Sequence, residues 1–283
     1  MTADPLTRTP PLPRPRRHRR AARAPWTLMY HSVDDRAAGD PYLVTVDPDR
    51  LAGQLRWLSR RGLTGVSMRE LLTARARGRA DRLVGLTFDD GYADFLTEAV
   101  PRLRDHGHTA TVFVLAGRLG GTNAWDPEGP RKPLLTADGV RGAHRAGMEI
   151  GSHGLLHRDL TALDDAELSL ELAESRRLLA EITGTVPMGF CHPYGAVDAR
   201  TLRAAREAGY AYACAVDPGP LACIHALPRT YVGHADTAPR LHTKRLLHRL
   251  RGPALAARSG GQPAPPPSAS PSASPAVPTG GDA

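Results

Sequence analysis

Apolar residues along this chain fall into two kinds of pattern, short continuous runs and longer segments with helical spacing. The short runs predict buried strands, and the helical spacing predicts amphipathic helices, several of which end at a glycine. The expected strands are residues 26–30, 83–88, 110–115, 149–152, 186–191 and 210–216. The expected helices are residues 49–62, 95–106, 136–146, 164–183 and 198–208. This strand–helix alternation predicts a parallel sheet or barrel, in which the chemistry lies at the carboxyl ends of the strands.

The two ends of the chain differ from its middle in composition. Residues 1–25 are rich in Arg and Pro, and residues 259–283 are a low-complexity Pro/Ser/Ala segment. Neither segment can bury enough apolar surface to fold, so both are predicted to be disordered tails. Residues 26–235 are predicted to form one domain, followed by a basic helix at 236–258. A hydrophobic content of 41% is sufficient for a real core.

The formal net charge of +8 is concentrated near the ends of the chain, which leaves the middle close to neutral. The Arg-rich start is short and has no recognition motif beside it, so no nucleic-acid partner is expected. Residues 236–251 place leucines among Arg and Lys, which suits a helix bound to a membrane surface. A helix that packs on the barrel with a solvated basic face explains the same pattern and is the preferred interpretation.

The sequence also bears on the cellular compartment. Three cysteines, Cys191, Cys214 and Cys223, form no CxxC pair, which is neutral to mildly favourable for a reducing compartment. No stretch reaches the length of apolar sequence that a spanning helix needs, and no apolar segment of a signal peptide precedes Trp26. The expected location is the cytoplasm. The sequence predicts no oligomeric state.

Two acidic residues, Asp89 and Asp90, follow the expected strand 83–88 directly. Adjacent carboxylates at a strand end are costly unless a cation or hydrogen-bond donors lie nearby. One of them could bind a metal ion while the other accepts a proton. An acidic turn explains the same residues, because Asp-Asp-Gly also suits a turn. Taken alone, the pair does not decide between these readings.

Two histidines, His153 and His157, are four residues apart after the expected strand 149–152. This spacing suits a shared metal ion on a helical turn, although alone it is weak evidence. Together with the acidic pair it predicts a ligand set of one carboxylate and two imidazoles. Such a set leaves coordination positions open for water and substrate.

Two further segments follow expected strands. Pro193-Tyr194-Gly195 predicts a rigid turn whose backbone N–H groups could hold a developing oxyanion, or an ordinary turn. His31 follows the first expected strand. It is a candidate general acid, or alternatively a histidine hydrogen-bonded to a carboxylate.

Several of these motifs occur together in a known family. The segments TFDDG at 87–91, SHGLLH at 152–157 with Leu160 after it, and PYG at 193–195, in this order, resemble the polysaccharide-deacetylase family, also called the NodB homology domain or carbohydrate esterase family four. The segment 120–126 resembles a loop of its bacterial members. The resemblance covers about residues 26–233. It implies an α/β fold, namely a distorted, incomplete (β/α) barrel, and a metal-dependent deacetylase.

The resemblance also implies roles for individual residues. Asp89 corresponds to the base that activates water. Asp90, His153 and His157 correspond to the ligands of a divalent metal ion, usually zinc. The backbone N–H of Tyr194 corresponds to the oxyanion-hole donor. The implied substrate carries an N-acetyl or O-acetyl group on an amino sugar, an oligosaccharide or a polysaccharide precursor, and a cytoplasmic enzyme would act on a soluble or lipid-linked precursor.

The sequence departs from the family pattern in two important places. Cys191 stands where many members have an arginine that orients the base, and Arg229 is hypothesised to do part of its work. Many members also end with a Leu-x-His motif that supplies the general acid, and nothing after Tyr231 fits that motif well. A permuted branch of the family takes its general acid from a Tyr-His pair on the first strand, which Tyr30-His31 resembles, so His31 is predicted to be the acid. Gly154 replaces the usual Thr or Ser after the first histidine.

Two alternative functions remain open from the sequence. Relatives of this fold include amidohydrolases that act on non-sugar C–N bonds, but some of these lack the histidine pair, so His153 and His157 favour the sugar deacetylase. A non-catalytic carbohydrate-binding protein is suggested by the absent arginine and opposed by the retained Asp89.

Overall fold

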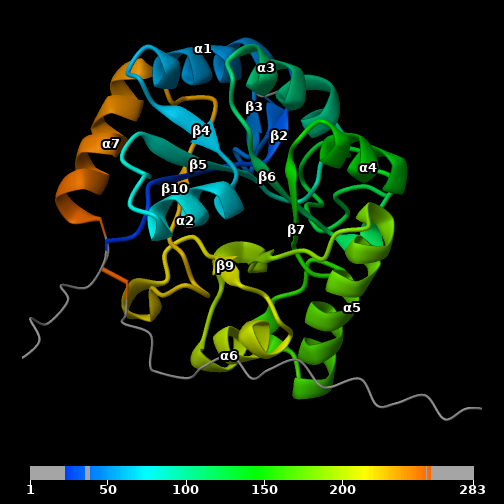
Figure 1. The fold of residues 1–283 in the computed structure, drawn as a ribbon. Coiled ribbons are helices and arrows are strands. Elements are labelled where there is room, and N and C mark those ends of the chain that lie inside the picture. The colour runs from blue at the N-terminus through cyan, green and yellow to red at the C-terminus, as the bar shows by residue number, and fades with distance from the viewer. Residues whose placement is uncertain (1–22, 36–38, 253, 256–283) are drawn as a thin grey trace, which may run out of the picture.

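The computed structural model describes residues 23–35, 39–252 and 254–255. Most of the two tails predicted to be disordered, 1–22 and 259–283, therefore lies outside the described residues. Within the described part, one curled sheet is surrounded by helices (Figure 1). Every pairing between its strands is parallel, as the strand–helix alternation predicts.

The main sheet has the strand order β10-β1-β5-β6-β7-β8-β9, and β4 also pairs with β5. A separate pair, β2 and β3, lies beyond the carboxyl end of β1. The strands are β1 Thr27–Tyr30, β2 Ser32–Val33, β3 Thr45–Val46, β4 Thr64–Val66, β5 Leu83–Phe88, β6 Thr111–Val114, β7 Glu149–Ser152, β8 Gly189–Cys191, β9 Tyr212–Cys214 and β10 Thr230–Tyr231. All six strands expected from the sequence are present.

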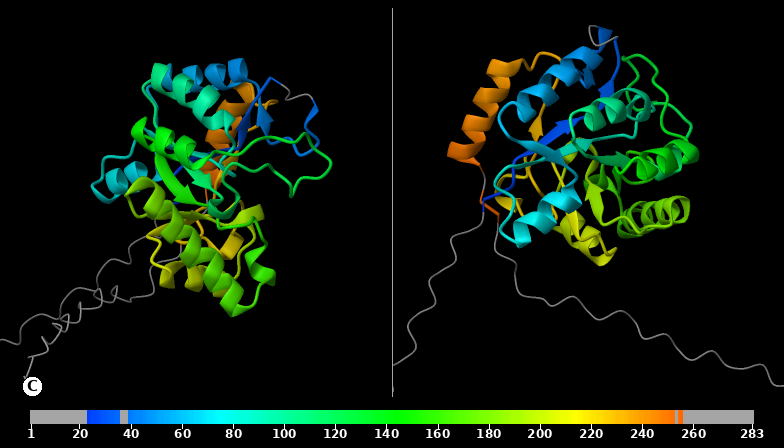
Figure 2. Two further views of the ribbon diagram at one scale, coloured as in Figure 1. Left: turned by 90° about the vertical axis from the view of Figure 1, so that its right-hand side faces the viewer. Right: turned by 45° about the horizontal axis from the view of Figure 1, so that its top comes forward.

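The helices cover the outside of the sheet (Figure 2). They are α1 Pro48–Ser59, α2 Met68–Ala76, α3 Val100–Asp105, α4 Ala137–Arg145, α5 Asp165–Thr183, α6 Ala199–Glu207 and α7 Ala238–Arg251. Helix α5 begins with a capping box: the side chain of Asp164 accepts the backbone N–H of Glu167, and the side chain of Glu167 accepts the backbone N–H of Asp164. The helix ends at Gly184, which has a φ of 68°.

The helix expected at 95–106 is divided into two parts. Residues Phe95–Ala99 form a π-helical turn, and the regular helix α3 starts only at Val100. Pro101 has no N–H to donate. In a regular α-helix its ring would also clash with the backbone carbonyl group of the residue one turn earlier. The N–H of Val100 bonds to the carbonyl of Phe95, five residues back, so the chain widens before the proline.

One segment, residues 227–232, contains the edge strand β10 and also contacts β9 at the other edge of the curled sheet. At its start, Leu227 exchanges backbone hydrogen bonds with Ala213 and Ala215 beside β9, and near its end Val232 donates to the carbonyl of Met29 in β1. The sheet therefore curls far enough for one stretch of chain to join its two edges. This arrangement agrees with the distorted barrel that the family resemblance implies.

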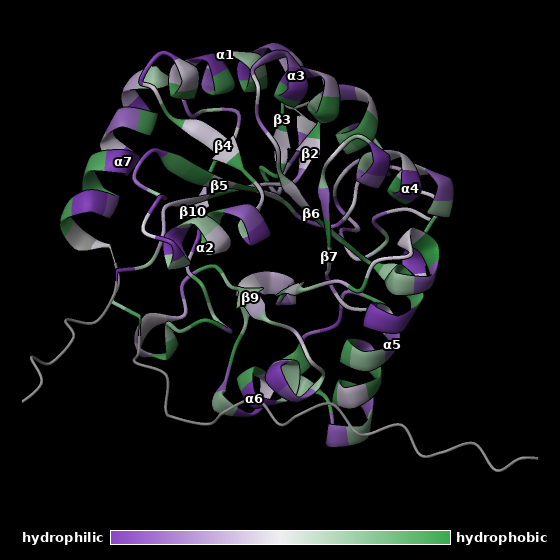
Figure 3. Ribbon diagram, viewed as in Figure 1, coloured by the Kyte–Doolittle hydropathy of each residue, from purple (hydrophilic) through white to green (hydrophobic). Residues whose placement is uncertain are grey.

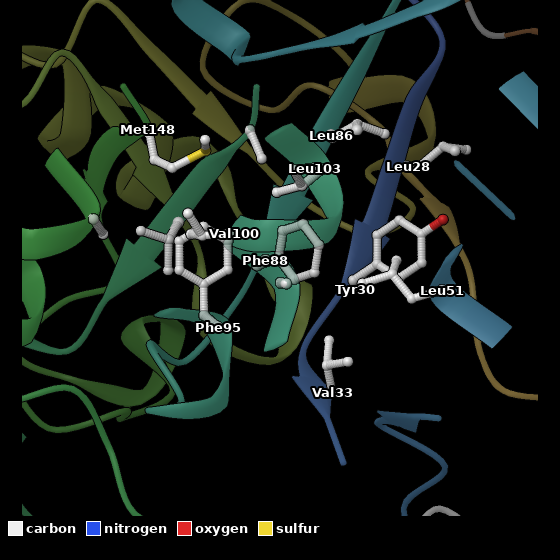
Figure 4. Packing of buried hydrophobic residues seen from close by; sticks show 14 of the residues in the cluster. Leu28, Tyr30, Val33, Leu51, Leu86, Phe88, Phe95, Val100, Leu103 and Met148 are labelled. Atoms are coloured by element: carbon white, nitrogen blue, oxygen red, sulfur yellow. The ribbon is translucent and has the colours of Figure 1, made fainter. Parts of the chain in front are cut away.

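The largest core cluster lies between the sheet and helices α1, α3 and α4. Figure 4 shows its centre, where Tyr30 and Phe88 stack at 5.1 Å and Phe95 packs against Phe88 at 5.0 Å. Aromatic pairs at such separations add to the free energy gained from burial alone. Hydrophobic and hydrophilic residues alternate around the outer helices (Figure 3), as expected for helices with one buried face. Among the described residues, no helix is long and apolar enough to cross a bilayer.

Candidate active site

The polar residues singled out in the sequence meet at the carboxyl ends of neighbouring strands. Asp89 and Asp90 follow β5, His153 follows β7, and His31 follows β1. Strands β1 and β5 are paired directly, and β5 is connected to β7 through β6. The parallel arrangement of the sheet thus brings together residues that are more than a hundred positions apart.

Asp90, His153 and His157 form a compact set of potential metal ligands. The Oδ1 atom of Asp90 lies 3.2 Å from Nε2 of His153 and 3.3 Å from Nε2 of His157. All three side chains are buried, and their ligand atoms lie within 4.8 Å of one another. Two ligands of one ion with bonds of about 2.1 Å are separated by about 3.0–3.4 Å in tetrahedral or octahedral geometry.

The environment of His153 orients its ring toward this point. Its Nδ1 atom lies 2.7 Å from the carbonyl oxygen of Cys191, so Nδ1 carries the proton and donates it there. The Nε2 lone pair is then directed at Asp90, whose buried Oδ1 finds no conventional hydrogen-bond partner among the described residues. A metal-binding histidine commonly donates its other ring N–H in this way. The residues present therefore fit a divalent metal ion.

The segment from His153 to His157 is a loop, not the helical turn suggested by the spacing of the two histidines. Gly154 has a φ of +87° and His157 a φ of +61°, and neither is compatible with a right-handed helix. The Oε2 atom of Glu171, a buried residue of α5, accepts the backbone N–H of Leu155 at 2.6 Å. A carboxylate thus replaces the helical hydrogen-bond pattern and fixes the loop that carries both imidazoles.

Two aromatic rings hold the imidazole of His157. Trp125 stacks on it at a centroid distance of 4.6 Å and an interplanar angle of 25°. Tyr194 meets it edge to face at 4.4 Å. Tyr194 lies in the expected Pro-Tyr-Gly turn and has a φ of 57° and a ψ of 0°, so this turn places an exposed tyrosine beside the candidate metal ligands.

Asp89 is held by Arg229. The Nη1 and Nη2 atoms of Arg229 donate to Oδ1 and Oδ2 of Asp89 at 2.6 and 2.7 Å, a bidentate pair buried from solvent. Arg229 also donates to Oγ1 of Thr87 at 3.1 Å and to the carbonyl oxygen of Ala215 at 3.1 Å. The arginine that the family motif would supply at position 191 is therefore replaced in space by one from the segment that joins the sheet edges.

Cys191 fills the space beside this ion pair. Its Sγ atom lies 3.0 Å from Nη2 of Arg229 and 3.6 Å from Oδ2 of Asp89. Burial raises the pKa of the Cys191 thiol well above its usual range, so it stays neutral. An arginine at this position would not be needed, because the guanidinium of Arg229 already occupies both oxygens of Asp89.

Both carboxylates are ionised at neutral pH. Burial by itself would raise the pKa of Asp89, but the charge and hydrogen bonds of Arg229 outweigh burial and lower it. For Asp90, contacts with His153 and His157 overcome the same effect of burial and hold the pKa well below its usual range. The site therefore offers two ionised carboxylates, one that could bind a cation and a second that could accept a proton.

His31 lies at the edge of this cluster. Its Nε2 atom is 3.9 Å from Oδ2 of Asp89, and its side chain is 16% exposed. Burial lowers the pKa of His31, although the charge of Asp89 opposes this effect. The Nδ1 atom has no hydrogen-bond partner among the described residues. The side chain is thus placed between Asp89 and solvent, where it could exchange a proton with a bound molecule.

Two residues of the site had no role in the sequence analysis. Trp125 lies in the segment 120–126 that resembles a family loop. Its contact with His157 depends on the conformation of that loop, which the sequence pattern does not give. Glu171 had a signal in the sequence. It is an acidic residue on the same helical face as Leu168, Leu172 and Ser175, all buried, and an acid on a buried face requires a specific partner.

The fold and the buried Asp/His/His set define an α/β protein with a site suited to a divalent metal at the carboxyl edge of its sheet. Residues 76–213 match the family model described as polysaccharide deacetylase, so this part of the chain resembles that family. The family resemblance of the motifs is confirmed.

Individual relatives agree with this assignment. One relative is YxkH of Bacillus subtilis, which is named as a polysaccharide deacetylase. The two sequences are 27% identical, and the alignment covers 68% of this chain and 64% of YxkH. The peptidoglycan-N-acetylglucosamine deacetylase of Bacillus cereus is 28% identical over 47% of this chain and 43% of its own length. The chain thus spans less than two thirds of each relative. The solved structure of the Streptococcus pyogenes deacetylase PplD has the same fold, with a TM-score of 0.68, 23% identity, and coverage of 79% of this chain and 98% of that one.

Proposed function

We propose that this protein is a metal-dependent deacetylase that hydrolyses N-acetyl or O-acetyl groups on an amino sugar, an oligosaccharide or a polysaccharide precursor. The observation that carries the proposal is the placement of Asp89, fixed by Arg229, beside the ligand set of Asp90, His153 and His157. In metal-assisted hydrolysis of an amide, a base beside the metal site accepts a proton from the attacking water. An ionised carboxylate held in a fixed orientation suits this role.

In this proposal Asp90, His153 and His157 hold the metal ion, and we propose zinc. One carboxylate and two imidazoles are common zinc ligands and leave coordination positions open. When bound, the ion supplies a Lewis acid that polarises the acyl group and lowers the pKa of water. The hydrogen bond from His153 to the Cys191 carbonyl supports this assignment, because it keeps the Nε2 lone pair free for a cation.

The remaining residues bind and move protons. Asp89 accepts a proton from the attacking water, and Arg229 keeps the carboxylate oriented while it does so. The backbone N–H of Tyr194 donates to the developing oxyanion. His31 takes over the proton that Asp89 accepted from water and delivers it to the departing nitrogen or oxygen, so that both side chains return to their starting protonation states. The distance of 3.9 Å between Nε2 of His31 and Oδ2 of Asp89 supports a shared reaction space for the two groups.

We infer an N-acetylglucosamine unit as the substrate class, supported by the name of the Bacillus cereus relative. We also propose a cytoplasmic location, supported by the absence of disulfides among Cys191, Cys214 and Cys223. Fractionation of cells that make the full chain, followed by detection of the protein in the soluble, membrane and exported fractions, tests the location. Recovery only in the exported fraction would contradict it.

The activity is tested with the purified full chain. The measurements are the metal content per chain and the release of acetate from chito-oligosaccharides by the wild type and by Asp89→Asn. We expect about one metal ion per chain in both proteins, and turnover lower by at least about 10²-fold in the variant. Removal of the metal with a chelator should abolish turnover, and zinc should restore it. Absence of bound metal together with no acetate release from any acetylated sugar would overturn the proposal.

A further inference from the structure

Helix α7, Ala238–Arg251, has an outward face that no other described element covers. Leu246, Leu247 and Leu250 are 49%, 43% and 65% exposed. On the opposite side of the helix, Leu241 is buried, and α7 packs beside α1 (Figure 2). At about 100° per residue, Leu246 and Leu250 lie roughly opposite Leu241. Leu246 and Leu250 therefore lie on the side of the helix that points away from the protein, and Leu247 extends this apolar stripe toward a hollow that it lines together with Leu43 and Tyr231.

This stripe is bordered by basic residues. Helix α7 contains no acidic residue. Arg245 lies near enough to Arg249, Arg61 and Arg82 to feel the charge of each, and none of these four guanidiniums has a carboxylate within ion-pair distance among the described residues. Burial and the charges of Arg249, Arg61 and Arg82 lower the pKa of Arg245. Such a group of like charges is costly unless it meets an anionic partner.

The start of the described chain adds to the same surface. The guanidinium of Arg23 donates to the carbonyl oxygen of Arg249, so the first described residue lies against the last turn of α7. Arg23 precedes β1, so this end of α7 lies near the amino ends of the strands, opposite to the candidate active site.

We propose that the outward face of α7, with Arg23, Arg61 and Arg82, docks the protein on an anionic lipid bilayer. Exposed leucines flanked by arginines are the pattern of a helix that lies in a membrane interface, with its apolar side among the acyl chains and its cations at the lipid phosphates. Docking by this end leaves the carboxyl edge of the sheet accessible. The inference does not depend on the proposed enzymatic activity.

Other occupants fit the surface less well. A second copy of the chain would bring two groups of unpaired arginines together, which like-charge repulsion opposes. A nucleic acid would neutralise the arginines but gives no reason for three exposed leucines between them, because its backbone offers phosphates and no apolar layer. A bilayer with anionic headgroups satisfies both the charged and the apolar part of the surface.

The experiment uses the purified full chain and sedimentation with vesicles of phosphatidylcholine alone or of phosphatidylcholine and phosphatidylglycerol in equal parts. We expect binding to the anionic vesicles to be at least about tenfold stronger than binding to the neutral ones, and weaker at about 0.5 M NaCl than at about 0.05 M. The double variant Leu246→Gln/Leu250→Gln should lose at least about tenfold in vesicle affinity. Arg249→Glu should also weaken binding.

Matched controls lie elsewhere on the surface. Leu170→Gln replaces a leucine of α5 that is 59% exposed, and Arg203→Glu reverses an exposed charge on α6, and neither should change binding. Thermal unfolding of each variant verifies that it is folded. Equal binding to both kinds of vesicle, or unchanged binding by the double leucine variant, would overturn the proposal. So would self-association that the leucine substitutions abolish, or binding to duplex DNA that exceeds binding to anionic vesicles.

Discussion

The guanidinium of Arg229 donates two hydrogen bonds to the carboxylate of Asp89, at 2.6 and 2.7 Å, although 140 residues separate the two in sequence. A bidentate pair fixes the carboxylate both in position and in rotation. The pair forms because the segment 227–232 joins the two edges of the curled sheet and brings Arg229 to the carboxyl end of β5. The orientation of the proposed base thus depends on the closure of the sheet.

The variant Arg229→Lys should show whether Arg229 orients Asp89 for the reaction or only stabilises the fold. Lysine keeps the charge but cannot donate in a bidentate fork, so Asp89 should rotate away from its reactive orientation. We expect kcat to fall by about 10²-fold with little change in KM or in metal content. Arg229→Met, which leaves Asp89 without a partner, should in addition lower the free energy of unfolding by about 3–5 kcal/mol. A kcat close to that of the wild type in Arg229→Lys would show that the pair is only structural.

His31→Ala should reduce turnover without affecting the metal. If His31 is the general acid, we expect kcat to fall by about 10²–10⁴-fold while the number of metal ions per chain is unchanged. Substrates with a better leaving group, such as an activated acetyl ester, should be affected less, because they do not need a proton at the departing atom. Loss of metal in this variant would instead make His31 a ligand or a support for one.

Glu171→Ala should weaken metal binding from a position behind the ligand loop. Glu171 accepts the backbone N–H groups of Leu155 and Leu156, and without it the loop that carries His153 and His157 loses its anchor. We expect the metal affinity, measured by competition with a chelator, to fall by about 10–100-fold. Glu174→Ala on the same helix removes only the exposed pair with Arg177 and serves as the control. A folded Glu171→Ala protein with the affinity of the wild type would contradict this role.

His108 should make the free energy of unfolding depend on pH. The side chain is buried, and its Nδ1 atom accepts the N–H of Gly65 at 3.2 Å, which requires the neutral ring. Burial lowers the pKa of His108, so the unfolded chain takes up a proton at a higher pH than the folded one. The contribution of His108 to stability is therefore present above the unfolded pKa of about 6.5 and is lost as the pH falls from there through the folded pKa.

The measurement is chemical denaturation at several pH values between about 7 and 4, a window that starts above the unfolded pKa. One such group changes the free energy of unfolding by at most about 1.4 kcal/mol per pH unit. His108→Gln should reduce the slope in this window, because glutamine has no proton to take up. The exposed His242→Gln is the control and should leave the slope unchanged. Identical slopes in the wild type and His108→Gln would exclude this source of pH dependence.

Much of the fold follows from local patterns in the sequence. The strand 83–88 and the helix at 164–183 agree with the structure nearly residue for residue, because their apolar spacing and caps act within a few neighbours. Strand β4 and helix α2 were not expected. Strand β4 has only three residues, one of them Gly65, and α2 buries only Met68 and Leu71, so neither has a clear period.

The sequence by itself determined the candidate chemistry, since Asp89, Asp90, His153 and His157 stand directly after apolar strands, and short-range periodicity is enough to identify such positions. Only the tertiary structure decided how they are held. It placed Arg229 on Asp89, exchanged the helical turn at 153–157 for a loop bound by Glu171, and left the leucines of α7 uncovered. These features depend on which distant segments meet when the sheet curls, and the geometry of that closure is not encoded in the spacing of residues along the chain.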